Sequence, residues 1–229
     1  MGGQACVFYG AAEFSRDTDF AILSTSESLA RLTLAMQELQ AVVIAVPPFA
    51  PEYLQRGHAI HFRCQHPEVA RLRVDVMSHM RGVAPFEELW QRRTTLQGED
   101  GTLYELMSLP DLVRAKKTQR DKDWPMIRRL IEADRAANPG PTSPERVRFW
   151  LQECRTPAIL LELASQYPSE AKILANESRP LLRLAIQNDL QGLEESLKAE
   201  EYAERALDQA YWKPLKAELE RLRHSEFSR

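Results

Sequence analysis

Two aspartates near the start of the sequence, Asp17 and Asp19, are separated by a single threonine and followed by an apolar run that begins at Phe20. This pattern predicts a strand over residues 17–24. Because successive side chains of a strand point to opposite faces, Asp17 and Asp19 share one face while Phe20 lies on the other. At about 3.3 Å per residue, the two aspartate Cα atoms are roughly 6.6 Å apart. Carboxylates at this spacing on a rigid element can bracket divalent cations ~3.5–4 Å apart, as two-metal sites require.

Asp75 is the candidate for a third ligand. Apolar side chains alternate through residues 71–78, which predicts a strand with Asp75 on the face opposite the core. If this strand and the first one are neighbours, the three carboxylates converge. Two carboxylates about 6 Å apart repel by roughly 3 kcal/mol at an effective dielectric near 20, so three in a cleft need cations beside them. The sequence therefore predicts a site for divalent cations. The alternative is that each aspartate merely lies on a solvated sheet face.

The residues before the aspartates carry a resemblance. Gly2 and Gly3 open a short predicted helix, and the Asp-Thr-Asp strand follows it. This arrangement resembles the nucleotidyltransferase superfamily with the polymerase-beta-like catalytic fold. It is similar in particular to stand-alone bacterial nucleotidyltransferase-like proteins, which include toxins of type IV toxin-antitoxin and abortive-infection systems. Gly2, Gly3 and Ala5 match the Gly-Gly-x-Ala opening of that group, whereas Glu13 and Ser15 stand where it carries arginine and threonine.

The resemblance implies a metal-dependent enzyme that transfers an NMP from an NTP to a hydroxyl acceptor. The acceptor stays open between an RNA end, a protein and a small molecule. The implied metal ions are Mg²⁺ or Mn²⁺. Their implied ligands, which are also the catalytic residues, are Asp17, Asp19 and Asp75. Nucleotide contacts are implied for Gly2, Gly3 and Ser15. The families place an apolar strand before the glycine pair, whereas only Met1 precedes it here. We therefore expect this sequence to be shortened at its N-terminus.

A basic stretch, KKTQRDKD, follows the predicted sheet and contains Lys116, Lys117, Arg120 and Lys122. The resembling families carry a lysine-rich helix with a trailing Lys-Asp at this point. The resemblance therefore implies that Lys116, Lys117 and Arg120 bind the nucleotide triphosphate from a helix. Lysine would act as a point charge and arginine as a fork of donors. The alternative is a solvated helix face, which is the commoner reason for a run of charge.

Four side chains suggest a second metal cluster: His58, His61, Cys64 and His66. On a strand, however, His61 faces away from the other three, and the spacing matches no usual zinc pattern. We therefore do not expect zinc at these residues.

The predicted fold class is α+β, with a mixed nucleotidyltransferase-type sheet flanked by helices in residues 1–137. A Pro- and Gly-rich linker spans 138–144, and an all-helical region spans 145–229. In the first part, the patterns predict a helix over 27–40 capped by Ser26 and a buried strand over 41–46. Further predicted elements are strands over 58–64 and 71–78, a hairpin of 94–97 with 102–107, and helices over 111–119 and 123–137.

Composition limits the wider possibilities. The 229 residues include 44% apolar side chains, enough for a core, and a net charge of −3 argues against a surface that wraps nucleic acid. Cys6, Cys64 and Cys154 are far apart and odd in number, which favours reduced thiols. No apolar run reaches the ~18 residues of a membrane span, so we expect a cytoplasmic protein without membrane contact.

A rival interpretation belongs to another functional class. Glu13 and the missing first strand favour a catalytically inactive relative that acts as an antitoxin-like or scaffold partner through its C-terminal helices. Leucines recur at helical spacing along that region, at Leu190, Leu193 and Leu197 and again from Leu215. Such stripes are more often intramolecular core, with a homodimer or a partner helix as the second explanation.

Overall fold

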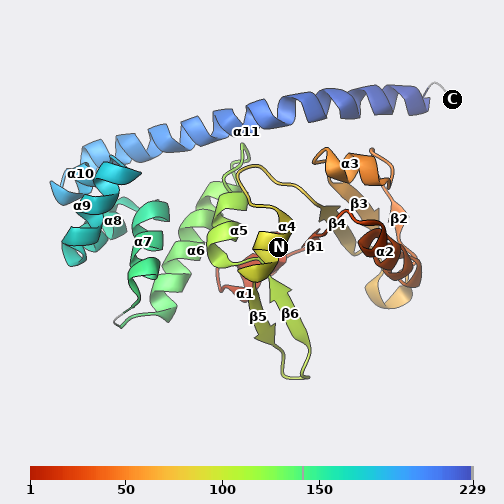
Figure 1. The fold of residues 1–229 in the computed structure, drawn as a ribbon, viewed down its shortest axis with the longest axis horizontal. Coiled ribbons are helices and arrows are strands. Elements are labelled where there is room, and N and C mark those ends of the chain that lie inside the picture. The colour runs from red at the N-terminus through yellow and green to blue at the C-terminus, as the bar shows by residue number, and fades with distance from the viewer. Residues whose placement is uncertain (141, 228–229) are drawn as a thin grey trace. The chain divides into compact units, whose positions relative to one another are not determined.

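The structure is a computed structural model that describes residues 1–140 and 142–227 (Figure 1). It is a mixed α+β protein, 57% helical and 11% strand, as predicted from the sequence. The chain divides into two compact units. The first contains residues 1–8 and 12–115 and the end of the chain from Ala210; the second contains residues 9–11 and 116–209. Among the described residues, no helix is both long enough and apolar enough to cross a membrane.

A four-stranded mixed sheet forms the centre of the first unit. Its order is β1 (Asp17–Ala21), β4 (Arg73–Met77), β3 (Ile60–Arg63) and β2 (Val42–Val43). β1 and β4 run parallel, whereas the other two neighbouring pairs are antiparallel. β1 therefore lies at one edge, with the central strand β4 as its sheet partner.

One face of this sheet is apolar because the strand residues alternate. Val74 and Val76 of β4 and Ile60 of β3 are buried in a cluster with helix residues such as Leu29 and Leu54. Those two leucines come from α2 (Ser26–Glu38) and α3 (Pro51–Gln55), which lie beside the sheet in Figure 1. The other face of β4 carries its polar positions, as the alternation predicts.

Two local predictions in this unit are wrong. Thr25, rather than Ser26, caps α2: its side chain accepts a hydrogen bond from the Ser28 N–H, while Ser26 is already helical. β2 is a two-residue edge strand whose Val42 and Val43 are exposed, not a buried strand. It is an outer strand that pairs with β3 alone, so its valines gain little cover.

The first unit also contains a hairpin and several short helical elements. The predicted hairpin is confirmed as β5 (Thr94–Gln97) and β6 (Leu103–Leu106), which pair with each other as a separate sheet. The short helical elements of this unit are α1 (Gly2–Phe8), the 3₁₀ turn η1 (Pro67–Val69), α4 (Phe86–Gln91) and α5 (Leu109–Ala115).

The second unit is helical. It contains α6 (Asp123–Ala137), α7 (Pro144–Glu153), α8 (Pro157–Gln166), α9 (Pro168–Glu177), α10 (Leu182–Ile186) and the first part of α11 (Leu190–Phe227). Proline opens three of these helices, where its missing N–H costs no helical hydrogen bond. The buried Arg179 donates to the carbonyl oxygens of Leu151 and Cys154 and pairs with Glu200 of α11, which joins the helices. Cys6, Cys64 and Cys154 are all buried, and none of these three cysteines forms a disulfide.

Candidate functional site

The sheet register brings the predicted aspartates together. Asp19 of β1 and Asp75 of β4 are direct Cα partners, and Asp17 stands opposite Arg73. Neighbouring strands lie about 4.8 Å apart, and partners in register point to the same face. The side chains of Asp17, Asp19 and Asp75 therefore project from the same face of the sheet, opposite the buried Val74 and Val76.

The glycine pair lies directly against this face. Gly2 has φ +66°, and a Cβ there would lie 1.8 Å from Oδ2 of Asp19. A Cβ on Gly3 would lie 2.3 Å from Oγ of Ser15. The Gly3 N–H donates to Asp19 Oδ2 at 3.3 Å, and Ser15 Oγ donates to the Asp17 carbonyl at 2.9 Å. The residues predicted around the aspartates thus form one cluster, which leaves no room for a side chain at Gly2 and room at Gly3 only if Ser15 moves.

Arg73 and His61 are two members of the site that the sequence interpretation missed. Asp75 Oδ1 lies 2.8 Å from Nε of Arg73 and 2.8 Å from Nδ1 of His61. Nη2 of Arg73 lies 3.1 Å from the same imidazole nitrogen. That nitrogen can either donate to Asp75 or accept from Arg73, so the histidine tautomer decides which bond forms. Strand alternation could have identified Arg73, because residues 73 and 75 lie on the same face of the predicted strand.

The electrostatics follow from these contacts. Burial by itself would raise the pKa of Asp75, but hydrogen bonds from His61 and Arg73 and their charges lower it below its usual value. The hydrogen bond to Asp75 raises the pKa of Arg73 against the effect of burial, and the charges of Asp75, Asp17 and Asp19 raise it further. One guanidinium therefore interacts with all three carboxylates and offsets part of their mutual repulsion.

Carboxylate oxygens suit Mg²⁺ or Mn²⁺, so the type of donor fits the predicted ions. Their arrangement is less complete. Within residues 1–140 and 142–227, no group of three or more His, Cys, Asp or Glu side chains is placed to hold a metal ion. Asp75 Oδ1 is already shared by Arg73 and His61. Both contacts end on Oδ1, so a metal ion at Asp75 would have to bind next to the guanidinium of Arg73.

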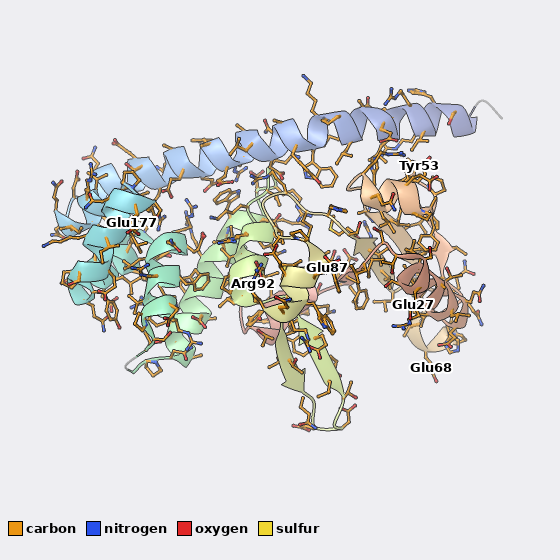
Figure 2. The ribbon with its side chains drawn as sticks, viewed as in Figure 1. Glu27, Tyr53, Glu68, Glu87, Arg92 and Glu177 are labelled. Atoms are coloured by element: carbon orange, nitrogen blue, oxygen red, sulfur yellow. The ribbon has the colours of Figure 1, made fainter. Side chains whose placement is uncertain are left out.

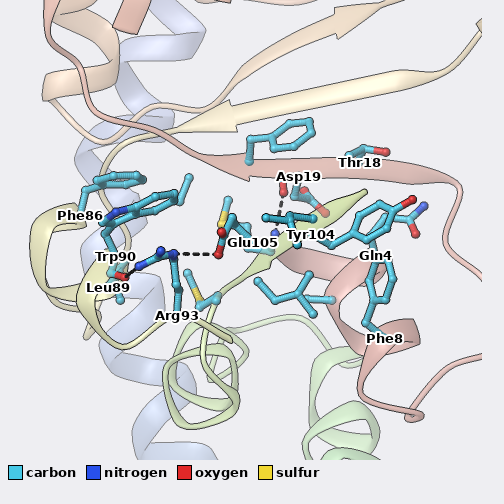
Figure 3. Close-up of a pocket in the computed structure, with 17 residues that line it drawn as sticks. Gln4, Phe8, Thr18, Asp19, Phe86, Leu89, Trp90, Arg93, Tyr104 and Glu105 are labelled. Carbon is cyan, nitrogen blue, oxygen red and sulfur yellow. Dashed lines mark hydrogen bonds and ion pairs between the residues drawn. The ribbon is translucent and has the colours of Figure 1, made fainter. Parts of the chain in front are cut away.

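A cavity of about 650 Å³ opens beside β1 and includes Asp19 in its wall (Figure 3). Its lining is mainly apolar and includes five aromatic side chains: Phe8, Phe20, Phe86, Trp90 and Tyr104. The polar side chains that line it include Gln4, Arg93 and Glu105. Nothing in the local sequence pattern indicated this cavity, because its walls come from α1, β1, α4 and the hairpin.

Arg92 fixes the helix that carries Trp90. Through Nε and Nη2 it donates to both carboxylate oxygens of Asp111, each at 3.1 Å, and Asp111 also accepts from Ser108 Oγ at 2.6 Å. Arg92 lies just beyond the end of α4 (Figure 2), whereas Asp111 belongs to α5. This forked contact positions one wall of the cavity.

The basic stretch differs from its predicted form. α5 ends at Ala115, and Lys116, Lys117 and Arg120 lie in the turn before α6, not on a helix. The buried Asp123 organises this turn: it accepts from Thr118 Oγ1 at 2.6 Å and pairs with Lys116 at 3.3 Å and Arg120 at 2.7 Å.

Lys117 pairs with Glu153 at 2.7 Å. The three cations thus have acidic partners within the second unit, whereas the aspartate site belongs to the first.

The histidines do not form a cluster, and His58 lies before β3 rather than on the predicted strand. His61 lies on the aspartate face, whereas the buried His58 contacts Glu218 Oε2 through Nε2 at 2.8 Å.

No protein-family model matches the chain, and the comparison with curated proteins finds no match.

Proposed function

We propose that this protein has the nucleotidyltransferase fold and transfers an NMP from an NTP to a hydroxyl group, as a bacterial, toxin-like enzyme of the cytoplasm. The observation that carries the proposal is the register of β1 and β4, which pairs Asp19 with Asp75 and keeps Asp17 on the same face. The close contact of Gly2 with Asp19 supports it, because it places a side-chain-free backbone beside the carboxylates.

In this proposal Asp17, Asp19 and Asp75 hold Mg²⁺ or Mn²⁺, which would neutralise charge on the phosphate oxygens. The acceptor oxygen attacks the α-phosphorus, the bond to the bridging oxygen breaks, and pyrophosphate leaves while the hydroxyl proton passes to solvent. Arg73 and His61 orient Asp75 through its Oδ1. Catalysis would consist mainly of positioning and charge neutralisation.

The test is to incubate the protein with each labelled NTP, Mg²⁺ or Mn²⁺ and whole-cell extract, and to identify the labelled species. We expect label on one class of acceptor and its loss in Asp19→Asn. Glu27→Gln is the matched control, because Glu27 lies in an exposed pair with Arg31. Absence of transfer with every NTP, or full activity in Asp19→Asn, would overturn the proposal.

Lys116, Lys117 and Arg120 are proposed to contact the triphosphate, in competition with their acidic partners. Replacing any of them by alanine should weaken NTP binding by about ten- to a hundredfold at low salt, and less at high salt. Calorimetric titration with Mg²⁺ and NTP measures this. If affinity stays within about twofold while only stability falls, these cations serve the turn around Asp123 and not the nucleotide.

The contact of Arg73 with Asp75 favours a second candidate, a catalytically inactive protein of this fold that binds a partner through its C-terminal helices. In that case Arg73 replaces the cation permanently. Titration with Mn²⁺ alone separates the two functions. The enzyme should bind Mn²⁺ as wild type, whereas the inactive protein should bind it only after Arg73→Met.

A further inference from the structure

The cavity beside Asp19 has two aromatic sides. On one side, Phe86 and Trp90 of α4 stack with ring centroids 5.9 Å apart. On the other, Phe8 and Tyr104 lie 5.1 Å apart, from α1 and the hairpin. Figure 3 shows these pairs at opposite ends of the cavity, with Asp19 near the Tyr104 end. All of these residues belong to the first unit, so the cavity is a feature of that unit alone.

Two of the aromatic rings that line the cavity, Trp90 and Phe20, are unusually exposed for their size. Trp90 is 46% exposed and Phe20 is 47% exposed, although aromatic side chains contribute most when buried. A volume of about 650 Å³ lies within the range of small-molecule sites, which are mostly apolar with a few polar groups. The cavity is therefore suited to a flat, largely apolar ligand.

Arg93 adds a planar, polar group to the wall of the cavity that Trp90 forms. Its guanidinium lies over the Trp90 ring at 4.0 Å, and its Nε donates to Glu105 at 2.7 Å. Glu105 also accepts from Thr95 Oγ1 at 2.6 Å. A guanidinium fixed over an aromatic ring presents a planar surface on which another planar group can stack.

Charge excludes an anionic ligand from the cavity itself. Among its lining side chains, Arg93 is a cation, whereas Asp19 and Glu105 are carboxylates. Arg93 is paired with Glu105, and the N-terminal ammonium of Met1, which also lines the cavity, donates to the Asp19 carbonyl oxygen at 2.8 Å. The Asp19 carboxylate would repel a phosphate unless a metal ion were bound. An uncharged planar group fits the cavity, and a phosphate fits only its Asp19 end with a cation present.

We propose that this cavity binds the base of the substrate nucleotide, stacked between the Arg93–Trp90 wall and Tyr104, with the phosphates directed toward Asp19. This inference rests on the proposed nucleotidyltransferase function and assigns the base-binding part of the same site. Gln4, Arg93 and Glu105 supply donors and acceptors for the edges of the base. Base stacking on side chains is strong enough to hold a nucleoside that has no phosphate.

The experiment titrates the full chain, without metal, with adenosine, guanosine, cytidine, uridine and ribose 5-phosphate, by calorimetry and by saturation-transfer NMR. At least one nucleoside should bind saturably, and ribose 5-phosphate should not. Trp90→Leu and Tyr104→Leu should each weaken nucleoside binding by about ten- to a hundredfold. Phe14→Leu is the control, because Phe14 is 69% exposed and does not line the cavity. Circular dichroism melting confirms that each variant is folded.

The outcomes separate this inference from the proposed function. Asp17→Asn should lose NMP transfer and keep nucleoside binding, because Asp17 does not line the cavity. Nucleoside binding without any transfer by the wild type would uphold the base site and reject the enzyme. Transfer whose KM for NTP is unchanged in folded Trp90→Leu and Tyr104→Leu would uphold the enzyme and overturn the base site. Failure of every nucleoside to bind would also overturn it.

Discussion

At the scale of single residues, Gly2 determines how closely the backbone approaches Asp19. Its φ of +66° suits a residue without a Cβ, and any Cβ there would collide with the carboxylate at 1.8 Å. Both the positive φ and the lack of room for a Cβ require glycine at position 2. Gly82 isolates the first requirement, because it has a similar φ of +70° but no heavy atom within 4 Å of the position its Cβ would take.

We predict that Gly2→Ala and Gly82→Ala both lose about 1–2 kcal/mol from the left-handed backbone, whereas only Gly2→Ala also displaces Asp19. Urea unfolding measures the first effect, and NMP transfer together with Mn²⁺ titration measures the second. Gly82→Ala should retain activity and metal binding. Equal activity in the two variants would show that Asp19 does not need its present position.

Asp75 gives a pH-dependent prediction. Burial would raise its pKa, but the contacts with His61 and Arg73 lower it. A lowered pKa in the folded state means that Asp75 stabilises the protein above its unfolded pKa of about 3.9, and that this stabilisation is lost as the pH falls through the folded value. The difference in free energy of unfolding between wild type and Asp75→Asn should therefore be largest near neutral pH and shrink below about pH 4.

Urea titrations across this pH range check the prediction. Glu27→Gln is the control, because its exposed pair with Arg31 contributes little at any pH. A difference between wild type and Asp75→Asn that stays constant down to acid pH would mean that Asp75 gains nothing from Arg73 and His61.

At the scale of elements, the cavity depends on how α4 is held. Asp111 is only 2% exposed, so its carboxylate needs the two hydrogen bonds that Arg92 donates across from the end of α4. A buried carboxylate that loses its cation retains an uncompensated charge. The contact therefore links the fold of α5 to the position of Trp90.

We predict that Arg92→Met destabilises the protein by about 1–3 kcal/mol and also weakens nucleoside binding, although Arg92 does not line the cavity. Arg31→Met, which breaks only an exposed pair, should change neither quantity. Unfolding and nucleoside titration measure the two effects. Normal binding in a destabilised Arg92→Met would show that α4 keeps its place without this contact.

At the scale of the whole molecule, the C-terminal part of the chain belongs to the first unit, which also contains the sheet. Residues from Ala210 belong to the same unit as the sheet, and Glu218 contacts both the buried His58 and Arg56. The hydrogen bond to His58 lowers the pKa of Glu218, against the opposing effect of burial. The last turns of α11 are therefore part of the unit that carries the aspartates.

We predict that Glu218→Ala lowers the free energy of unfolding by about 1–3 kcal/mol, because it leaves the buried imidazole of His58 without its carboxylate. Glu220→Ala is the matched control, since Glu220 is exposed two positions away on the same helix. Chemical unfolding of both variants at neutral pH is the measurement. Equal stabilities would show that the contacts of Glu218 with His58 and Arg56 do not stabilise this unit.

The sequence by itself determined the features that depend on local alternation. The period of the strands places Asp17, Asp19 and Asp75 opposite their core faces, and the turn residues 98–101 mark the hairpin. Tertiary structure decided which of these faces meet. The register of β1 and β4, the contacts of Arg73 and His61 with Asp75, and the cavity all join segments far apart in the chain. Local periodicity carries no information about such distant pairings.

The prediction of a helix for the basic stretch was wrong for a related reason. Asp123 accepts hydrogen bonds from Thr118 and Arg120 and holds the stretch in a turn, which the charge pattern alone does not reveal.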